Sequence, residues 1–207
     1  MKINYTNIMF KITLIVVFLI SLLFGVVYVV NEKSKPTVKS IVVEPFLTQK
    51  VKEHEPTIEK YAKQYNVENH VDTILAMMMQ ESGGRGNDPM QSSESLCGEV
   101  GCIDSPEKSI EQGVKYFAEN LKISDGDVRL AVQSYNFGAG FSKYVRNKEE
   151  GFTQEVAIEF SQNMYEKAED KSIYTCLRKE AKEYDACYGD IYYARDVMEY
   201  KKLFAKK

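Results

Sequence analysis

Hydrophobic and polar positions follow a helical pattern along most of the chain after residue 44. Apolar residues recur at spacings of three, four and seven, which places them on one face of a helix. No stretch sustains the two-residue alternation that predicts a strand. Helices are expected at about 45–65, 71–81, 106–121, 128–137, 141–146, from 154 onward and at 191–203, with 171–188 partly helical. The pattern predicts an all-α domain over residues 45–207.

Polar residues suited to a helix N-terminus precede three of these helices. Ser105, Asp127 and Thr153 each carry a side-chain oxygen that can accept a hydrogen bond from the first turn. Pro56 should divide the first stretch into two helices, because proline fits a first turn but not a helix interior. The expected buried positions are Phe46, Val51, Ile58, Tyr61, Tyr65, Ile110, Val114, Phe117, Leu121, Val156, Phe160 and Met164. With 207 residues and 44% hydrophobic content, the chain can bury one good core.

Glu81 stands at the end of the apolar helix expected at 71–81. The residues three, four and seven positions before it are apolar, so its side chain should point where the core points. A carboxyl group among apolar side chains is expected to have a raised pKa, and an acid still protonated near neutral pH can act as a general acid. Gly83 and Gly84 should end the helix and leave room for a ligand, with Glu81 at the mouth of a cleft. The alternative for Glu81 is a solvated helix end.

The segment 85–103 is rich in Gly, Ser, Asn and Asp and is too long for a plain connection, which is typical of a functional loop. Asp88 lies in it and is a candidate second carboxylate, because glycoside hydrolysis with two acids needs one on each side of the bond. In a polar loop Asp88 should stay ionised while Glu81 stays protonated. The alternative is an Asx turn before the following proline. Glu94 and Glu99 are expected to be solvent-facing charges.

The first 44 residues have a different pattern. Residues 12–30 contain no charged side chain, and this length is about what crosses a bilayer as one helix. They predict an uncleaved transmembrane anchor that follows a cytoplasmic tail, 1–11. A cleaved signal peptide is the alternative, but its apolar region would be shorter and no small-residue cleavage site follows. Residues 31–44 show no helical period and predict an extended stalk.

All four cysteines come after this apolar segment and fall into two close pairs. Export to an oxidising compartment would make them disulfides. Of three pairings, the most local joins Cys97 to Cys102 and Cys176 to Cys187, each bond stabilising the fold by roughly 2 to 3 kcal/mol. Reduced cysteines or a zinc site are the alternatives, but the spacing lacks the usual C-x-x-C of a zinc knuckle. We therefore expect no metal and no cofactor.

The net charge of the chain argues against a nucleic-acid-binding protein, and its histidines argue against a catalytic triad. A formal net charge of −3 and a pI of about 5.6 provide no global basic surface, so no nucleic-acid partner is expected. The two histidines, His54 and His70, show no partner pattern for a catalytic triad. The chemistry therefore depends on carboxyl groups.

Four motifs occur in a fixed order: ESGG, DPMQSSES, SIEQGVKYF and QSYNFGAG. In this order they resemble the lysozyme-like muramidase domain of conjugative-element cell-wall hydrolases of Gram-positive bacteria, which is related to goose-type lysozymes and lytic transglycosylases. The resemblance spans roughly residues 46–200. It implies a lysozyme-like fold and cleavage of the β-1,4 bond between N-acetylmuramic acid and N-acetylglucosamine in peptidoglycan. Two-domain relatives also carry a C-terminal peptidase domain; because this sequence ends at Lys207, we expect that activity to be absent.

The resemblance also implies roles for single residues. The matched positions are Glu81 for the catalytic acid, Asp88 for the acid of the DPMQ segment, Gln91 and Ser93 for cleft residues, Tyr135 with Asn136 for the pair near the acid, and Tyr193 for the tyrosine that faces the acid. By their chemistry, Tyr135 should hydrogen-bond the Glu81 carboxyl, and Asn136 and Gln91 should bind sugar N-acetyl groups. Ordinary packing is the alternative for the tyrosines, and a helix cap for Asn136.

These observations predict a membrane-anchored muramidase on a Gram-positive cell surface, with its lysozyme-like domain, 45–207, on the extracytoplasmic side. Its expected substrate is the peptidoglycan strand, and the resemblance implies conjugation or secretion machinery as a partner. Remodelling of the wall during growth is an equal alternative. Two other activities stay open. One is a lytic transglycosylase that forms 1,6-anhydromuramoyl products, and the other is a catalytically silent glycan-binding surface protein.

Overall fold

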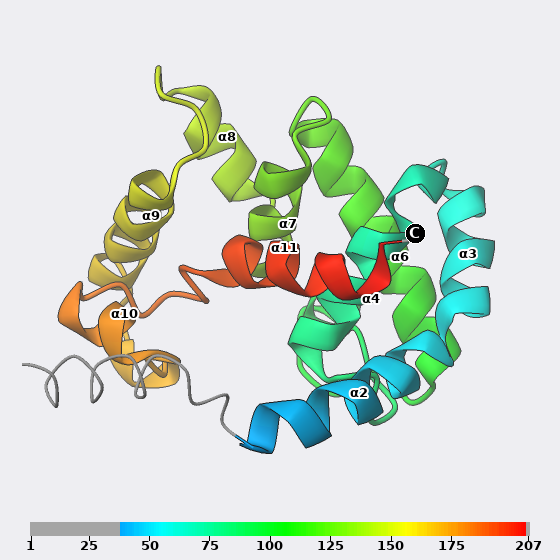
Figure 1. Cartoon of the computed structure of the whole chain (residues 1–207). Helices are drawn as coiled ribbons and strands as arrows, with labels where there is room; N and C mark the ends of the chain where they lie inside the picture. The colour runs from blue at the N-terminus through cyan, green and yellow to red at the C-terminus, as the bar shows by residue number, and fades with distance from the viewer. Residues whose placement is uncertain (1–37, 206–207) are drawn as a thin grey trace, which may run out of the picture. The chain divides into compact units, whose positions relative to one another are not determined.

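The computed structural model describes residues 38–205, and every regular element among them is a helix (Figure 1). The all-α class is confirmed for this part of the chain. None of these helices is long and apolar enough to span a membrane. The predicted tail, 1–11, and transmembrane segment, 12–30, lie outside the described residues and stay predictions. The chain divides into two units, Met1–Glu44 and Pro45–Lys207, and the candidate site lies within the second.

The order of the helices along the chain matches the expected one. The helices are α2 (Val38–Lys52), α3 (Glu55–Gln64), α4 (Val71–Glu81), α5 (Ser93–Cys97), α6 (Pro106–Ile123), α7 (Val128–Phe137), α8 (Gly140–Arg146), α9 (Gln154–Glu166), α10 (Lys179–Glu183) and α11 (Tyr193–Phe204), with short 3-10 turns η1 (Glu68–His70) and η2 (Lys171–Ile173). Pro56 lies in the first turn of α3 and separates it from α2, as predicted. The short helix α5, within the expected loop 85–103, was not predicted.

The three predicted N-caps are present. In each case the side-chain oxygen accepts a hydrogen bond from the backbone N–H three residues later. Ser105 makes this bond at the start of α6, Asp127 at the start of α7 and Thr153 at the start of α9. These local signals fix where the helices begin.

Two expectations for the segment before α3 are wrong. The helix α2 begins at Val38, so the described end of the stalk expected over 31–44 is helical rather than extended. Pro45, expected at the start of the first helix, lies inside α2. Phe46 is 66% exposed rather than buried. Leu47 and Val51, four positions apart on one helical face, pack against the core in its place.

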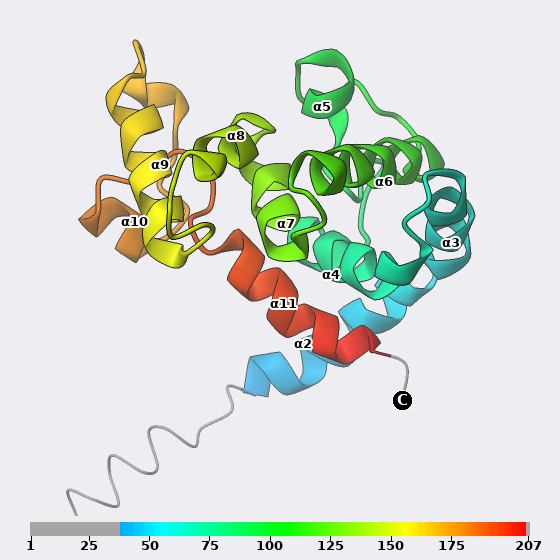
Figure 2. The same cartoon turned by 90° about the horizontal axis from the view of Figure 1, so that it is seen from above.

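The helix α4 lies at the centre of the larger apolar core. All seven residues from Thr73 to Met79 are buried. α4 packs most extensively against α11, and Figure 2 shows it between α11 and α6. Val114 and Phe117 of α6 and Val197 of α11 complete this core. The packing fixes α4 along its length, and with it the residue at its end, Glu81.

A second apolar cluster packs α7, α8, α9 and the segment around α10 together. Phe137, Phe141 and Phe160 form its centre, and the rings of Phe141 and Phe160 meet edge to face at 5.0 Å. This cluster supports the C-terminal end of α7, where Asn136 is found.

Both predicted disulfides are confirmed. Cys97 is bonded to Cys102 beside α5, and Cys176 is bonded to Cys187 across α10. No cysteine among the described residues is free. Each bond closes a short loop, and the two loops lie at different places in the domain.

Candidate active site

Glu81 is the last residue of α4, and two glycines follow the C-cap residue Ser82. Gly83 and Gly84 have φ angles of 64° and 74°, which non-glycine residues rarely adopt. The amide of Gly83 donates to the carbonyl of Met78 at 3.0 Å and closes the last turn. The side chain of Glu81 is partly buried, and the hydroxyl of Tyr193 in α11 donates a hydrogen bond to its Oε1 at 2.5 Å.

Burial raises the pKa of Glu81 from 4.5 to about 7. The hydrogen bond from Tyr193 favours the carboxylate and lowers this pKa, whereas the negative charges of Asp88 and Asp190 raise it. Burial is the largest of these effects, as the apolar residues of α4 predicted. A carboxyl group with a pKa near 7 holds its proton in a large fraction of molecules at neutral pH and suits a general acid.

The space beside Gly83 and Gly84 is filled by residues of α2 and is not open to a ligand. A Cβ atom on Gly83 would stand 2.9 Å from Leu47 Cδ2, and one on Gly84 would stand 3.2 Å from the carbonyl oxygen of Lys50. Both contacts come from α2. The expectation that a ligand approaches the backbone here is wrong, because α2 occupies that space.

The carboxylate of Asp88 is surrounded by hydrogen-bond donors. Its Oδ1 accepts from the Ser109 hydroxyl at 2.6 Å and the Ser92 amide at 2.9 Å. Its Oδ2 accepts from the Ser93 hydroxyl at 2.6 Å and the Ser93 amide at 3.1 Å. These bonds tie the start of α5 to α6. Burial alone would raise the pKa of Asp88, but the donors from Ser109, Ser93 and Ser92 outweigh burial and lower it, so Asp88 stays ionised near neutral pH.

Two adjoining cavities form a cleft beside these acids. One has a volume of about 320 Å³ and is lined by Glu81, Asp88, Gln91, Ser93, Glu94, Val100, Tyr135 and Asn136. The other, of about 230 Å³, is lined by Gln91, Glu94, Ser95, Tyr116, Tyr135, Asn136, Phe137, Gly138 and Tyr188. Four residues line both cavities: Gln91, Glu94, Tyr135 and Asn136. All seven residues predicted to form the site, except Tyr193, line this cleft.

Tyr135 does not form the predicted hydrogen bond to Glu81. Its hydroxyl donates to the carbonyl of Met90 at 2.8 Å. A buried carbonyl needs a donor, and Met90 lies close because Gly113 of α6 leaves space for its side chain. Tyr193 makes the bond to Glu81 in its place, and the rings of Tyr135 and Tyr193 are nearly parallel with centroids 6.5 Å apart.

Asn136 has a fixed side-chain orientation. Its Oδ1 accepts a hydrogen bond from the backbone amide of Asp190 at 2.7 Å. The approach requires a glycine at position 189, where a Cβ would stand 2.7 Å from the same oxygen. The amide nitrogen of Asn136 therefore has no described protein partner and is available to a ligand in the cleft.

Gln91 and Ser93 form the wall of the cleft at the start of α5. Gln91 has a φ angle of 48°, a strained value for a residue with a side chain. Its Nε2 donates to the carbonyl of Asp88 at 2.8 Å. Ser93 is buried and its hydroxyl is engaged with Asp88 and with the amide of Ile103. Its side chain therefore supports the wall more than it offers a free donor.

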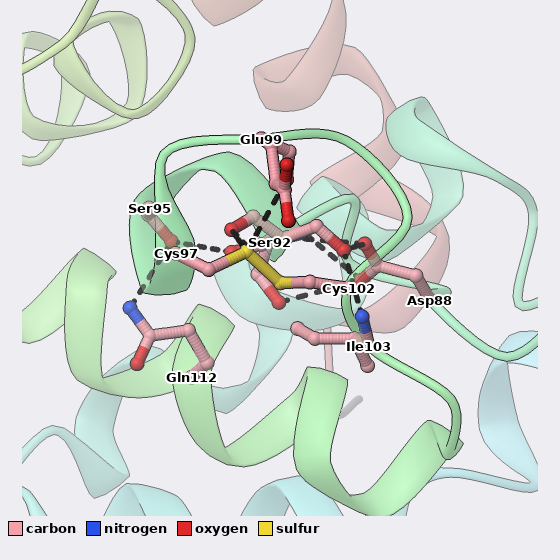
Figure 3. Close-up of a disulfide and its surroundings, with 9 residues drawn as sticks. Asp88, Ser92, Ser95, Cys97, Glu99, Cys102, Ile103 and Gln112 are labelled. Atoms are coloured by element: carbon pink, nitrogen blue, oxygen red, sulfur yellow. Dashed lines mark hydrogen bonds between the residues drawn. A yellow bond between two sulfur atoms is a disulfide. The ribbon is translucent and has the colours of Figure 1, made fainter.

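The disulfide between Cys97 and Cys102 closes the loop beside this wall, as Figure 3 shows. Val100, which the loop carries, is 77% exposed and lines the larger cavity. On the other side of α5, Gln112 of α6 donates to the hydroxyl of Ser95 at 3.1 Å (Figure 3). The loop and α5 are thus fixed at both ends.

Sequence reasoning missed two features of the site. Glu94 lines both cavities instead of facing only solvent, whereas Glu99 lines neither. Asp190 is buried and forms a two-bond ion pair with Arg178 at 2.7 and 2.6 Å. The spacing of Glu94 three residues after Gln91 was the available signal for the first, and no local pattern indicated the second. Within residues 38–205 no group of three or more acidic, His or Cys side chains could hold a metal ion.

Known proteins resemble the chain over most of this domain. A family model described as lysozyme-like matches residues 48–201. The chain is 40% identical over 156 residues to the bifunctional muramidase/DL-endopeptidase CwlT of Bacillus subtilis (strain 168), a match that covers 75% of this chain and 43% of CwlT. It is 37% identical over 168 residues to the uncharacterized membrane protein YocA of the same strain, which covers 79% and 72% of the two chains.

A solved structure has the same fold. It is the crystal structure of a protein similar to a lipoprotein of the NLP/P60 family from Staphylococcus aureus subsp. aureus Mu50. The TM-score is 0.64 at 38% identity, over 73% of this chain and 52% of that one. The chain therefore spans less than half of CwlT and about half of the staphylococcal protein.

Proposed function

Since this chain belongs to the lysozyme-like family, we propose that it is a muramidase. It cleaves the β-1,4 bond between N-acetylmuramic acid and N-acetylglucosamine in peptidoglycan, with Glu81 as the general acid. The single observation that carries this proposal is the pKa of Glu81, which burial raises to about 7 at the wall of a cleft lined by amide and hydroxyl groups. The muramidase activity in the name of CwlT supports the choice of bond.

In the proposed reaction the Glu81 carboxyl gives its proton to the glycosidic oxygen as the bond to the sugar breaks. Tyr193 holds the carboxyl in place through its hydrogen bond. Burial and the neighbouring Glu81 charge raise the pKa of Tyr193 well above its ordinary value, so its phenol keeps the proton that it donates. The amides of Asn136 and Gln91 bind the N-acetyl groups of the sugars, and Tyr135 and Ser93 shape the wall.

For Asp88 we propose a role as a fixed anion. A direct catalytic part, as the sequence predicted, stays a prediction. The four close donors around its carboxylate support a role in which Asp88 anchors the start of α5. Its charge adds to the effect of burial in raising the pKa of Glu81. A carboxylate with both oxygens occupied is poorly placed to attack a sugar or to accept a further proton.

A lytic transglycosylase is the second candidate, favoured by the occupied oxygens of Asp88. In that reaction the 6-hydroxyl of the muramoyl residue attacks in place of water, and one acid is enough. Mass spectrometry of digested peptidoglycan separates the two reactions. We expect reducing muramic ends and loss of activity in Glu81→Gln; 1,6-anhydromuramic ends would establish the transglycosylase. A Glu81→Gln variant that cleaves as fast as wild type would contradict Glu81 as the acid in both reactions. A wild-type protein that binds glycan strands without cleaving them would be the catalytically silent alternative.

We also propose that the domain lies on the outer surface of a Gram-positive cell, anchored by residues 12–30. The disulfides support an oxidising compartment, and the relative YocA is named a membrane protein. Protease added to intact protoplasts should remove the domain, and protection of the domain would contradict the assignment. On the cell surface the domain would remodel the wall or open it locally for a conjugation or secretion channel. The frequency of conjugative transfer in a strain that lacks this protein would test the conjugation role.

A further inference from the structure

The cleft contains an acid that the proposed reaction has not used. Glu94 lies in the first turn of α5, is exposed, and lines both cavities of the cleft. Its carboxylate has no hydrogen-bond or ion-pair partner within residues 38–205. An acid in this position can therefore bind water or substrate without breaking a contact of the fold.

Asp88 is the opposite case in the same cavity. Its oxygens accept hydrogen bonds from the hydroxyls of Ser93 and Ser109 at 2.6 Å each and from two backbone amides. Accepting a proton would break several of these charge-assisted bonds at once. Besides Glu81, the acids that line the larger cavity are Asp88 and Glu94. Of these two, only Glu94 has carboxylate oxygens free for a reacting molecule.

The backbone that carries Glu94 is held rigidly, which a catalytic group requires. Asp88 binds the first amides of α5, the disulfide from Cys97 to Cys102 closes its far end, and Gln112 of α6 holds Ser95. The two acids come from different elements, Glu81 from the end of α4 and Glu94 from α5, and both wall one cavity of about 320 Å³. A cavity of this size accommodates a water molecule together with part of a sugar.

We propose that Glu94 is the second catalytic carboxylate, acting as the general base that activates water. This inference rests on the proposed hydrolysis. Glu81 gives its proton to the glycosidic oxygen, and the bond from that oxygen to the anomeric carbon breaks. Water attacks the anomeric carbon while its proton passes to Glu94. The products are a free hydroxyl and a reducing sugar, and the proton returns from Glu94 to Glu81 through solvent, so atoms and charge balance.

The first test compares three single variants on purified peptidoglycan: Glu94→Gln, Glu81→Gln and the matched control Glu99→Gln. Glu99 lies on the same loop and lines neither cavity, so its variant removes the same charge without touching the cleft. General-base catalysis contributes about 100-fold to 10,000-fold. We expect kcat of Glu94→Gln to fall by at least about 100-fold with KM nearly unchanged, while Glu99→Gln retains wild-type kcat. Circular dichroism and Tm should be unchanged in both.

A second test uses Glu94→Ala with added sodium azide. Azide needs no base, so it should replace water, restore turnover and give a glycosyl azide identified by mass spectrometry. The same addition should not rescue Glu81→Ala on a substrate with a poor leaving group. Absence of any rescue, or a product with a reducing end only, would contradict the role of base.

The outcomes separate the inference from the proposed function. If Glu81→Gln is inactive and Glu94→Gln keeps wild-type kcat, or raises KM alone, the role of Glu94 is overturned and the muramidase assignment stands. Anhydromuramic products from the wild type would also overturn it, because no water is then activated. If Glu81→Gln keeps full activity, the proposed function itself has failed.

Discussion

The end of α4 and the turn that leads into α5 each present a carboxyl group to one cavity, with opposite consequences. Glu81 has one hydrogen-bond partner in Tyr193, and burial raises its pKa to about 7. Asp88 lies only seven positions later, and serine hydroxyls and backbone amides lower its pKa in spite of burial. The number of donors, rather than the type of acid, decides which group keeps its proton.

The difference also separates catalysis from structure. Glu81 has one hydrogen-bond partner and a pKa raised by burial, as the proposed general acid requires. Asp88 makes many contacts and stabilises the fold around it. Changes at the two positions should therefore affect different measurements.

The largest expected effect is on turnover at Glu81. Glu81→Gln keeps an acceptor for the Tyr193 hydroxyl but removes the proton donor. We expect kcat to fall by about 100-fold to 10,000-fold, measured by release of soluble muropeptides from purified walls. Glu99→Gln is the control. Similar kcat values for Glu81→Gln and Glu99→Gln would mean that Glu81 is not the proton donor.

The next effect is on stability at different pH. A carboxyl group whose pKa is higher in the folded protein binds its proton more tightly there, so stability should fall as pH rises from 4.5 to above about 7. The rise in pKa from 4.5 to about 7 corresponds to at most about 3 to 4 kcal/mol at 1.4 kcal/mol per pH unit. Glu81→Gln should therefore raise the urea midpoint at pH 8 and leave it nearly unchanged at pH 4. Equal midpoints of variant and wild type at pH 8 would show that Glu81 is not buried.

Asp88→Asn should mainly lower stability. One carboxylate oxygen becomes an NH₂ group that cannot accept from the donors around it, a loss of about 1 to 3 kcal/mol. Because its pKa is lowered in the folded protein, the stabilisation by Asp88 is present above its unfolded pKa and is lost as the solution is acidified. The difference in urea midpoint should therefore shrink at low pH. Asp104→Asn, an exposed position near the same loop, is the control.

The smallest effect is expected at Tyr193. Tyr193→Phe removes the hydrogen bond that favours the Glu81 carboxylate, so the pKa of Glu81 should rise further. The alkaline limb of the pH profile of kcat should move to higher pH, and kcat should fall by about tenfold as one hydrogen bond that positions the acid is lost. Tyr192→Phe, the neighbouring residue, should move neither. If the alkaline limb of Tyr193→Phe stays at the wild-type pH, the ionisation of Glu81 does not control that limb.

Local patterns predicted much of the fold and part of the site. The helical period located α4 and placed Glu81 among apolar side chains, and capping residues located the starts of α6, α7 and α9. The pairing of the cysteines followed from their closeness in the sequence. Each of these features depends on residues a few positions apart, which the chain geometry brings together whatever the rest of the fold does.

Tertiary structure alone decided the contacts between distant elements. Tyr193, 112 positions from Glu81, binds the acid, whereas Tyr135 turns to Met90. Ser109, 21 positions from Asp88, occupies one of its oxygens. The sequence by itself determined most of the helices, the starts of α6, α7 and α9, and the burial of one acid. Which side chains meet that acid depended on how separate helices pack, because residues far apart in the chain are positioned by the whole core and not by a local period.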